Sequence, residues 1–370
     1  MNDEQIESWM RRAIELAEKG RGQVEPNPMV GCLIVKDSVL IGQGYHEKYG
    51  EGHAEVNALR QCNESPAGST VIVTLEPCCH HGKTPPCSQA LIDAQVKEVI
   101  VGHQDPNPQV DGGGLAALQA AGIETRCGFL KYEIVLQNLG FFLRVRQQRP
   151  WVIAKYAMTM DGNIATATGS SKWISNDRCR EHVHQLRGQV DAIIVGSQTV
   201  LADNPRLNAR PPGPRMATKV VLDSRAQTPL DSNIVQSAPT EPAILFVNRS
   251  KSDSSKIASL EKAGVEVIAC SSPYIDRIHH VLQELGKRGM TNVLLEGGSR
   301  LMGEFFQAGH IDELRTYIAP KLIGSGISPN TSPCFDTIAD GPKMTLVEVQ
   351  EIDGNVYTRS LSEDSLMNLN

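Results

Sequence analysis

Hydrophobic residues recur along the first 150 residues with two different periods, which predicts alternating helices and strands. Apolar residues spaced three and four apart over 3–19 predict a helix that ends at Gly20. Runs of aliphatic and β-branched residues predict strands at 29–35, 39–44, 70–75 and 98–102, and one that begins at Ile123. Further helices are expected near 53–59, 87–94 and 115–121, and a single amphipathic helix over 131–146.

After Pro150 the pattern predicts a second set of elements built on a mostly parallel sheet. Short apolar runs alternate with helical stretches, one of them near 176–186, as expected where helices join parallel strands. The expected strands are 151–158, 192–195, 219–222, 244–247, 265–269, 293–295, 314–318, 345–349 and 356–360. We therefore expect two α/β domains, at 1–149 and 150–362, followed by a polar, frayed tail at 363–370.

Composition narrows the classes of partner. The formal net charge is -6 and the basic residues are scattered, which argues against nucleic acid or an anionic membrane as the main partner. The acidic start has no apolar segment typical of a secretory signal, and no apolar run reaches the ~18 residues of a membrane span. Nine cysteines without a signal indicate reduced thiols, so we expect a cytoplasmic protein.

The stretch from His53 to Cys87 carries the most specific chemistry. It contains H-A-E at 53–55 and E-P-C-C-H-H-G-K-T-P-P-C at 76–87. One imidazole and two thiolates, from His53, Cys78 and Cys87, are three good zinc ligands, and three protein ligands leave a fourth position for water. Zinc lowers the pKa of such a water to ~7, and Glu55 could carry its protons. Zinc deaminases with H-x-E and P-C-x-x-C share this pattern, although here the second cysteine follows nine residues after the first.

His53 and Glu55 can share one site only at the start of a helix. Residues two apart inside a helix point about 200° from each other. Gly50 and Gly52 precede the pair, and Cys87 likewise opens a helical run. We therefore expect both ligand groups at helix N-termini, where the partial positive charge favours thiolate and carboxylate.

A closed structural zinc site is the alternative interpretation. Such sites have four protein ligands, and Cys79, His80 or His81 could supply the fourth. We favour the open site because Glu55 fits hydrolytic chemistry. Cys79, directly beside Cys78, cannot easily face the same metal from an extended backbone.

The motifs in the second half of the chain are less specific for a function, because each of them also occurs for purely structural reasons. E-G-G-S-R-L-M-G at 296–303 ends a strand and opens a helix, where backbone N–H groups can bind a phosphate. The loop 199–205 supplies Thr199 and Asp203, although a simple turn before Pro205 would use them too. Arginines that could grip a phosphate are Arg187, Arg206 and Arg210. From where these residue types usually lie in proteins, we expect Trp173 to be a buried anchor and His182 and His184 to lie on the surface of a helix.

Taken together, these motifs resemble the bacterial bifunctional riboflavin-biosynthesis deaminase-reductase family. The resemblance rests on H-A-E, L-E-P-C-x-H-x-G-x-T-P-P-C at 75–87, D-P-N-P at 105–108, K-x-A-x-x-x-D-G at 155–162, S-K-W-I at 171–174, T-V-L-A-D-x-P at 199–205 and E-G-G at 296–298. It implies an N-terminal cytidine-deaminase-like three-layer α/β/α domain and a C-terminal dihydrofolate-reductase-like α/β domain. Cys79 replaces the small polar residue usual at its position, which we take as harmless.

The resemblance also implies two consecutive reactions on one phosphorylated pyrimidine. The first is zinc-dependent hydrolytic deamination of a diaminopyrimidinone ribosylamine phosphate, with Glu55 as the proton carrier. The second is reduction of the ribosyl group of the aminouracil product to ribityl by NADPH. Residues implied to hold the deaminase substrate are Asn27, His46, Lys83, Thr84, Asp105 and Asn107.

For the reductase, the resemblance implies a nucleotide site and a substrate site. Residues implied to bind NADPH are Ala157, Trp173, Thr199, Asp203, Ser224, Gly298, Ser299, Arg300, Leu301, Met302, Gly303 and Glu304. Residues implied to bind substrate are Ser171, Arg187, Leu207, Arg210 and Glu296, with Lys155 as a partner of the reacting sugar.

Two rival functions stay open at this stage. One is a zinc deaminase of nucleosides or tRNA with an unrelated appended domain, against which the long cysteine spacing and the absence of a basic face argue. The other is a non-enzymatic binding module with a structural zinc, against which Glu55 argues. We expect a homo-oligomer, and no nucleic-acid or membrane partner.

Overall fold

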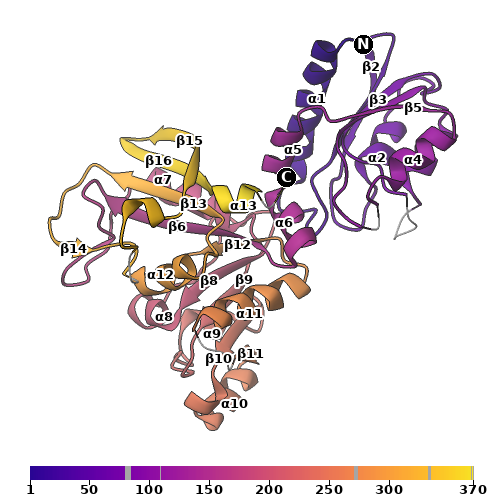
Figure 1. Cartoon of the computed structure of the whole chain (residues 1–370). Helices are drawn as coiled ribbons and strands as arrows, with labels where there is room; N and C mark the ends of the chain where they lie inside the picture. Colours follow the sequence, from indigo (N-terminus) through magenta and orange to yellow (C-terminus); the bar gives the residue numbers. More distant parts are fainter. Residues whose placement is uncertain (80–84, 109, 271–273, 332–334, 368, 370) are drawn as a thin grey trace. The chain divides into compact units, whose positions relative to one another are not determined.

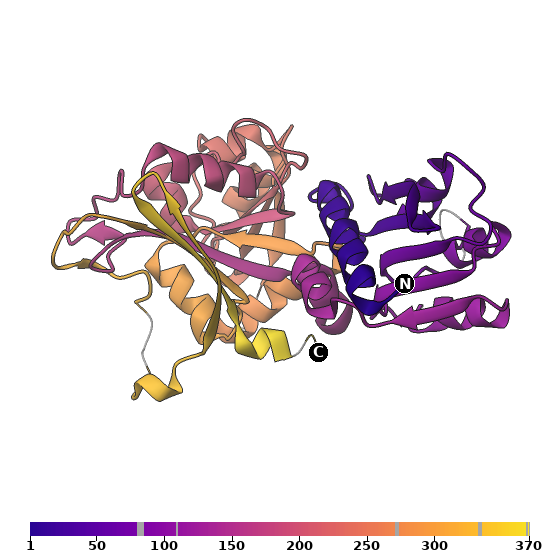
Figure 2. The ribbon, with the colours of Figure 1, turned by 90° about the horizontal axis from the view of Figure 1, so that it is seen from above.

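The structure is a computed structural model of the whole chain, and it describes residues 1–79, 85–108, 110–270, 274–331, 335–367 and 369 (Figures 1 and 2). The chain divides into two compact units, residues 1–147 and 148–370. All the strands expected from the sequence are present, with ends shifted by no more than three residues. None of the described helices is both long enough and apolar enough to cross a membrane.

The first unit has a five-stranded sheet in the order β2-β1-β3-β4-β5. β1 runs antiparallel to β2 and β3, and β3, β4 and β5 are parallel to one another. The strands are β1 (Gly31–Lys36), β2 (Val39–Tyr45), β3 (Thr70–Leu75), β4 (Glu98–His103) and β5 (Glu124–Cys127). The helices are α1 (Asp3–Ala17), α2 (Ala54–Arg60), α3 (Cys87–Asp93), α4 (Gly113–Ala120), α5 (Lys131–Gln137) and α6 (Leu139–Gln147), with a 3-10 turn η1 (Glu18–Gly20).

Both faces of this sheet are covered, which gives the expected three layers (Figure 1). Side chains alternate between the faces of a strand. On one face Leu33 and Ile72 pack against Met10 of α1 and Ile134 of α5. On the other face, residues of β1, β3 and β4 pack against α2, α3 and α4. The apolar, β-branched composition of β3 and β4 therefore reflects strands that are buried on both sides.

One expected helix is interrupted. The sequence pattern predicts a single helix over 131–146, whereas the structure has α5 and α6 with Asn138 between them. The Asn138 side chain accepts from the N–H of Met29 at 2.8 Å and donates to its carbonyl at 3.1 Å. This buried contact over 109 residues of sequence competes with the helical conformation, and periodicity does not reveal it.

The second unit has a nine-stranded sheet in the order β11-β10-β9-β8-β12-β6-β13-β16-β15. It is parallel from β11 to β13 and antiparallel at β16 and β15. Its strands are β6 (Trp151–Thr159), β8 (Ala192–Gly196), β9 (Thr218–Leu222), β10 (Ala243–Val247), β11 (Glu266–Ala269), β12 (Asn292–Leu295), β13 (Glu313–Ala319), β15 (Met344–Ile352) and β16 (Asn355–Ser362), and β7 (Ala165–Thr166) pairs separately with β14 (Gly326–Ile327). Its helices are α7 (Asp177–Arg187), α8 (Ser197–Asp203), α9 (Asn233–Ser237), α10 (Ser254–Lys262), α11 (Tyr274–Lys287), α12 (Ser299–Gln307) and α13 (Glu363–Met367), with 3-10 turns η2 (Arg249–Lys251) and η3 (Ile338–Asp340).

The expectation of a frayed tail is wrong for residues 363–367. Residues 363–367 form α13, and Ser365 is buried. The Ser365 hydroxyl donates to the Asp312 carboxylate at 2.7 Å, and Arg149 donates two bonds to the same carboxylate at 2.7 and 2.9 Å. Ser365, one of the polar residues after Leu361, is thus a partner of a buried charge, which composition alone does not indicate.

Candidate active sites

The first candidate site is built where two helices begin. His53 is the N-cap residue of α2, with extended backbone, and Glu55 lies in its first turn. Cys87 is the first residue of α3, and Cys78 follows the end of β3 by three residues. The expected placement at helix mouths is confirmed. An extended residue followed by the first helical turn lets His53 and Glu55 approach one site, which a regular helix would prevent.

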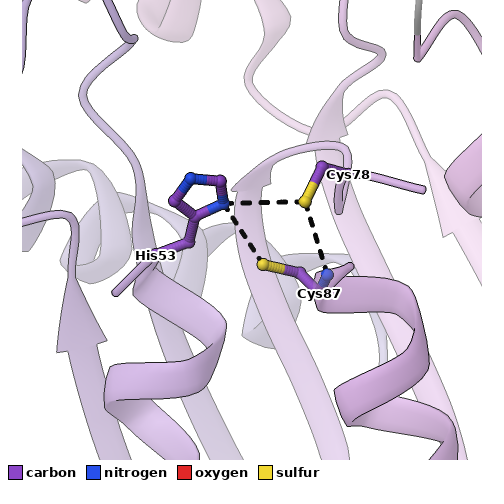
Figure 3. Close-up of side chains that lie close together, drawn as sticks. All are labelled: His53, Cys78 and Cys87. Carbon is purple, nitrogen blue, oxygen red and sulfur yellow. Dashed lines mark hydrogen bonds between the residues drawn. The ribbon is translucent and has the colours of Figure 1, made fainter. Parts of the chain in front are cut away.

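The three ligand candidates lie together (Figure 3). Nδ1 of His53 is 3.6 Å from Sγ of Cys78 and 3.3 Å from Sγ of Cys87. A tetrahedral zinc with Zn–S near 2.3 Å and Zn–N near 2.0 Å has an N···S edge of about 3.5 Å. The donor atoms therefore fit a zinc ion in both kind and spacing. The backbone N–H of Cys87 also donates to Sγ of Cys78 at 3.3 Å, which favours a thiolate there.

The electrostatics of this group favour a thiolate at Cys78, whereas the hydrogen bond with Cys78, followed by burial, raises the pKa of Cys87. A hydrogen bond from the Cys87 thiol lowers the pKa of Cys78 to about 4, against the opposing effect of burial and with support from His53. A hydrogen bond with Cys78 raises the pKa of His53. Burial, followed by the neighbouring Cys78, raises the pKa of Glu55 to about 7. A carboxyl with a pKa near neutrality can both accept and return a proton.

Among the described residues, no fourth protein ligand joins the group. Only His53, Cys78 and Cys87 bring ligand atoms within 4.8 Å of one another in the part of the chain that the structure describes. Cys79 points elsewhere: a Cβ added at Gly113, at the start of α4, would lie 2.7 Å from its Sγ. His80 and His81, the other candidates for a fourth ligand, lie outside the described residues.

A cavity of about 260 Å³ opens onto His53 and Cys78 and is lined by four of the residues expected to hold substrate. These four are Asn27, His46, Asp105 and Asn107. Nε2 of His46 lies 3.2 Å from the Asn27 amide, and its Nδ1 lies 3.2 Å from the Gly52 carbonyl. Burial lowers the pKa of His46, so the neutral ring donates through Nδ1 and accepts through Nε2. Lys83 and Thr84 lie outside the described residues.

Glu76 is a residue of this site that the sequence patterns did not single out. Its buried carboxylate accepts backbone N–H bonds from Asp105 at 3.3 Å, Gly112 at 3.1 Å, Gly114 at 3.0 Å and Leu115 at 3.1 Å. It thereby connects the segment that carries Cys78 to the loop at Asp105 and to the start of α4. Its place in the E-P-C motif, directly after a buried strand, is the sequence signal that could have found it.

The second candidate site is a cavity of about 400 Å³ at the carboxyl ends of β8, β9 and β12. Several residues expected to bind nucleotide line it, namely Thr199, Ser224, Gly298, Ser299, Arg300, Leu301 and Glu304. α12 begins at Ser299, and its N-cap residue is Gly298, which has no side chain that could cap the helix. A Cβ at Gly298 would approach only Thr199 Oγ1 within 4 Å, at 3.9 Å. Backbone donors and open space at this helix start fit the pyrophosphate of a dinucleotide.

Other expected nucleotide contacts are placed differently. Met302 and Gly303 are buried inside α12, and Ala157 lies half-buried on β6. Asp203 pairs with Lys172 at 3.4 Å. Trp173 is not a buried anchor, because 64% of its surface is exposed and its ring stacks 4.5 Å from the Arg180 guanidinium.

Residues expected to hold the reductase substrate form a charged cluster beside β6 and β12. Arg187 donates to both carboxylate oxygens of Glu296, at 2.7 and 2.9 Å, and Lys155 lies 3.7 Å from the same carboxylate. Burial would raise the pKa of Glu296, but Arg187 and Lys155 outweigh it and lower the pKa to about 2. Arg210 lies 3.4 Å from the His184 ring. Leu207 is buried, and Ser171 is exposed.

His182 differs from its expected surface position. Its ring is half-buried, and Nδ1 lies 3.2 Å from the Tyr317 hydroxyl. It also stands edge-on to Tyr357, with ring centroids 4.8 Å apart. Many neighbours of His182 in α7 are charged, so the sequence pattern does not indicate that this side chain is partly buried.

Comparison with known proteins covers both units. Residues 3–103 match the cytidine and deoxycytidylate deaminase zinc-binding region, and residues 150–358 match the RibD C-terminal domain. The chain is 46% identical over 318 residues to riboflavin biosynthesis protein RibD of Actinobacillus pleuropneumoniae, covering 85% of this chain and 84% of the relative. It is 40% identical to RibD of Escherichia coli K12, covering 95% and 98% of the two chains.

Two solved structures match the fold of this chain over nearly its whole length. Form 1 of Acinetobacter baumannii RibD has a TM-score of 0.87 at 37% identity and covers 98% of this chain and 99% of its own. A Thermotoga maritima protein described as a diaminohydroxyphosphoribosylaminopyrimidine deaminase/5-amino-6-(5-phosphoribosylamino)uracil reductase has a TM-score of 0.85 at 35% identity, covering 97% and 99%.

Proposed function

The chain belongs to the RibD family of bifunctional riboflavin-biosynthesis enzymes, and on that premise we propose the substrates, the cofactor and the residue roles of its two reactions. It is a deaminase and a reductase, with a zinc-binding deaminase domain and a reductase domain that uses a nicotinamide cofactor. A nucleoside or tRNA deaminase with an unrelated second domain is not favoured, because the family matches extend over both units.

The deaminase substrate is 2,5-diamino-6-(5-phosphoribosylamino)pyrimidin-4(3H)-one, by similarity to the activity in the name of the Thermotoga maritima relative. Zinc held by His53, Cys78 and Cys87 would supply the Lewis acidity that makes a water nucleophilic at neutral pH. Asn27, His46 and Asn107 hold the pyrimidine against the ligand cluster, because they line the same cavity. Lys83 and Thr84 complete this set by the resemblance alone.

Glu55 carries the protons of this first reaction. The buried carboxylate takes a proton from the attacking water and returns it to the leaving amine, so that a C–O bond forms, the C–N bond breaks and ammonia leaves. The position of Glu55 beside the ligands, without being one of the three clustered donors, supports this role.

The reductase acts on 5-amino-6-(5-phosphoribosylamino)uracil with NADPH as the hydride donor. The cavity at the start of α12 holds the nucleotide through Thr199, Ser224 and the first residues of the helix. The cluster of Lys155, Arg187 and Glu296 orients the phosphorylated sugar, with Arg210 nearby. Ser171 and Leu207, and on the nucleotide side Ala157, Trp173 and Asp203, keep their assignments as predictions from the resemblance.

Assembly and location remain predictions. We expect a homo-oligomer in the cytoplasm, and no nucleic-acid or membrane partner, on the composition arguments given above.

The single observation that carries the proposal is the His53–Cys78–Cys87 cluster at a cavity that His53, Cys78 and Glu55 line. The test is turnover by the purified chain loaded with zinc. We expect ammonia release from the pyrimidine phosphate and NADPH consumption on its deaminated product. Deamination of cytidine or tRNA with no reaction of the pyrimidine phosphate would contradict the proposal.

A further inference from the structure

The deaminase cavity has an acidic lining, although the proposed substrate is a phosphate ester. The carboxyl groups of Glu51, Glu55, Glu76 and Asp105 line it. In the part of the chain that the structure describes, no lysine or arginine does so. Carboxylates repel a dianionic phosphate, so a phosphorylated substrate requires a compensating cation near this cavity.

The cavity opens to solvent at residues 49–51. Among the described residues that line it, only these three are exposed, and 47% of the surface of Tyr49 is accessible. Glu55, beside the candidate metal ligands, is buried. The reacting carbon of the pyrimidine must reach those ligands, so the ribosyl phosphate extends away from them toward the mouth. A cation that binds the phosphate is therefore expected beside Tyr49.

Arg144, on α6, is a cation beside this mouth. Phe141 lines the cavity, and residues three apart lie on the same face of a helix, so Arg144 extends from the face of α6 that carries Phe141. Burial lowers the pKa of Arg144, and Tyr49 opposes this effect, so the two side chains are near each other. Two neighbours of Arg144 thus line the cavity, one of them at its exposed end.

The Arg144 guanidinium has no hydrogen-bond or ion-pair partner among the described residues. Its Nε is buried and finds no acceptor there. Burying a cationic donor without an acceptor is unfavourable, and native proteins rarely retain such a group without a reason. An anion bound at the mouth of the cavity would supply the missing acceptor.

The helix dipole is the ordinary explanation for an arginine at this place. Arg144 and Arg146 both lie in the last turn of α6, where a positive charge is favourable. Arg146 is exposed and supplies such a charge from solvent. The dipole does not explain why the Nε of Arg144 is buried without an acceptor, whereas a bound phosphate does.

We propose that Arg144 binds the phosphate of the deaminase substrate at the mouth of the cavity, beside Tyr49, and selects the phosphorylated pyrimidine over its riboside. This inference rests on the proposed deaminase function and deepens it. A guanidinium can give a phosphate two parallel, charge-assisted hydrogen bonds. The phosphate does not change during deamination, so these bonds are equally strong in the ground state and the transition state. They therefore act on KM and leave kcat nearly unchanged.

The test is steady-state deamination by the purified full chain loaded with zinc, acting on the phosphorylated pyrimidine and on the riboside that a phosphatase makes from it. We expect Arg144→Met to raise the KM for the phosphorylated substrate by roughly ten- to a hundredfold and to change kcat by less than about threefold. Its kinetics on the riboside should match those of the wild type. Methionine keeps an aliphatic stem and leaves no donor to bury, so the variant should fold.

Two further variants serve as comparisons. Arg146→Met is the matched control, because Arg146 is an exposed arginine of the same helical turn that points about 200° away from Arg144. It should leave the KM unchanged. Arg144→Lys restores the charge without the planar fork, so it should recover part of the affinity for the phosphorylated substrate.

Each outcome has a defined meaning. Equal losses on the two substrates, or a loss no larger than that of Arg146→Met, would overturn the role of Arg144. A fall in kcat at unchanged KM would overturn it too. Wild-type protein that deaminates the riboside as efficiently as the phosphate ester would overturn the phosphate subsite and leave the deaminase function standing. Wild-type protein that deaminates neither would overturn the proposed deaminase function as well.

Discussion

Glu55→Gln should lower the rate of deamination by about 10²- to 10⁴-fold, because an amide can neither accept nor return the proton that the reaction moves. The variant should keep its zinc, since Glu55 is not among the three clustered ligand residues. It should also keep its reductase activity, since the nucleotide cavity lies in the other compact unit. Ammonia release, zinc content and NADPH oxidation on the deaminated intermediate check the three expectations.

Glu47→Gln is the control for this variant, because Glu47 is an exposed carboxylate eight residues away that does not line the cavity. It should deaminate at the wild-type rate. Unchanged turnover in Glu55→Gln would instead revive the reading of the metal as purely structural. Loss of zinc together with turnover would assign Glu55 to the metal ligands.

Arg149→Met should destabilise the reductase unit by about 3–5 kcal/mol, because it leaves the Asp312 charge buried without its cation. The Arg149 and Asp312 side chains are 7% and 0% exposed, and two hydrogen bonds join them. The N–H of Val152 and the Ser365 hydroxyl, the other partners of this carboxylate, carry no charge that could replace the guanidinium. The measurement is urea unfolding followed by tryptophan fluorescence in a Trp9→Phe background, where the remaining tryptophans, Trp151 and Trp173, report only on this unit.

Two comparisons make this prediction specific to buried charge. Arg178→Met removes an arginine that pairs with Glu181 at the surface, with side chains 70% and 60% exposed, and should cost less than about 1 kcal/mol. Adding Asp312→Asn to Arg149→Met should recover part of the loss, because it removes the uncompensated charge. A loss in Arg149→Met no larger than that in Arg178→Met would show that the pair contributes nothing through its burial.

Regular patterns in the sequence predicted most of the fold because hydrophobic burial produced them. The strand at 70–75 is β-branched or aliphatic at every position, since both of its faces are covered, and its bounds are those expected. The proximity of His53, Cys78 and Cys87 could also be predicted from their residue types and spacing, and the structure brings these three side chains together. The argument that His53 and Glu55 must lie at a helix mouth required only helix geometry.

The features that the sequence did not predict depend on contacts between distant residues. Asn138 breaks a helix because it bonds the backbone of Met29. Near the chain end, residues 363–367 form a helix in which the Ser365 hydroxyl bonds Asp312, and Glu76 organises the deaminase cavity through backbone groups of a later loop. Periodicity records which face of an element is apolar, but it does not record the partner of a single polar side chain.

X-ray absorption of the zinc-loaded wild-type protein tests the central claim most directly, because it counts the atoms bound to the metal. We expect two sulfur ligands at about 2.3 Å and two lighter ligands at about 2.0 Å, one from His53 and one from solvent. Zinc should bind at one ion per chain, and its removal should abolish deamination while NADPH oxidation continues. A third sulfur, or a second imidazole in place of solvent, would close the site and contradict hydrolysis at this centre.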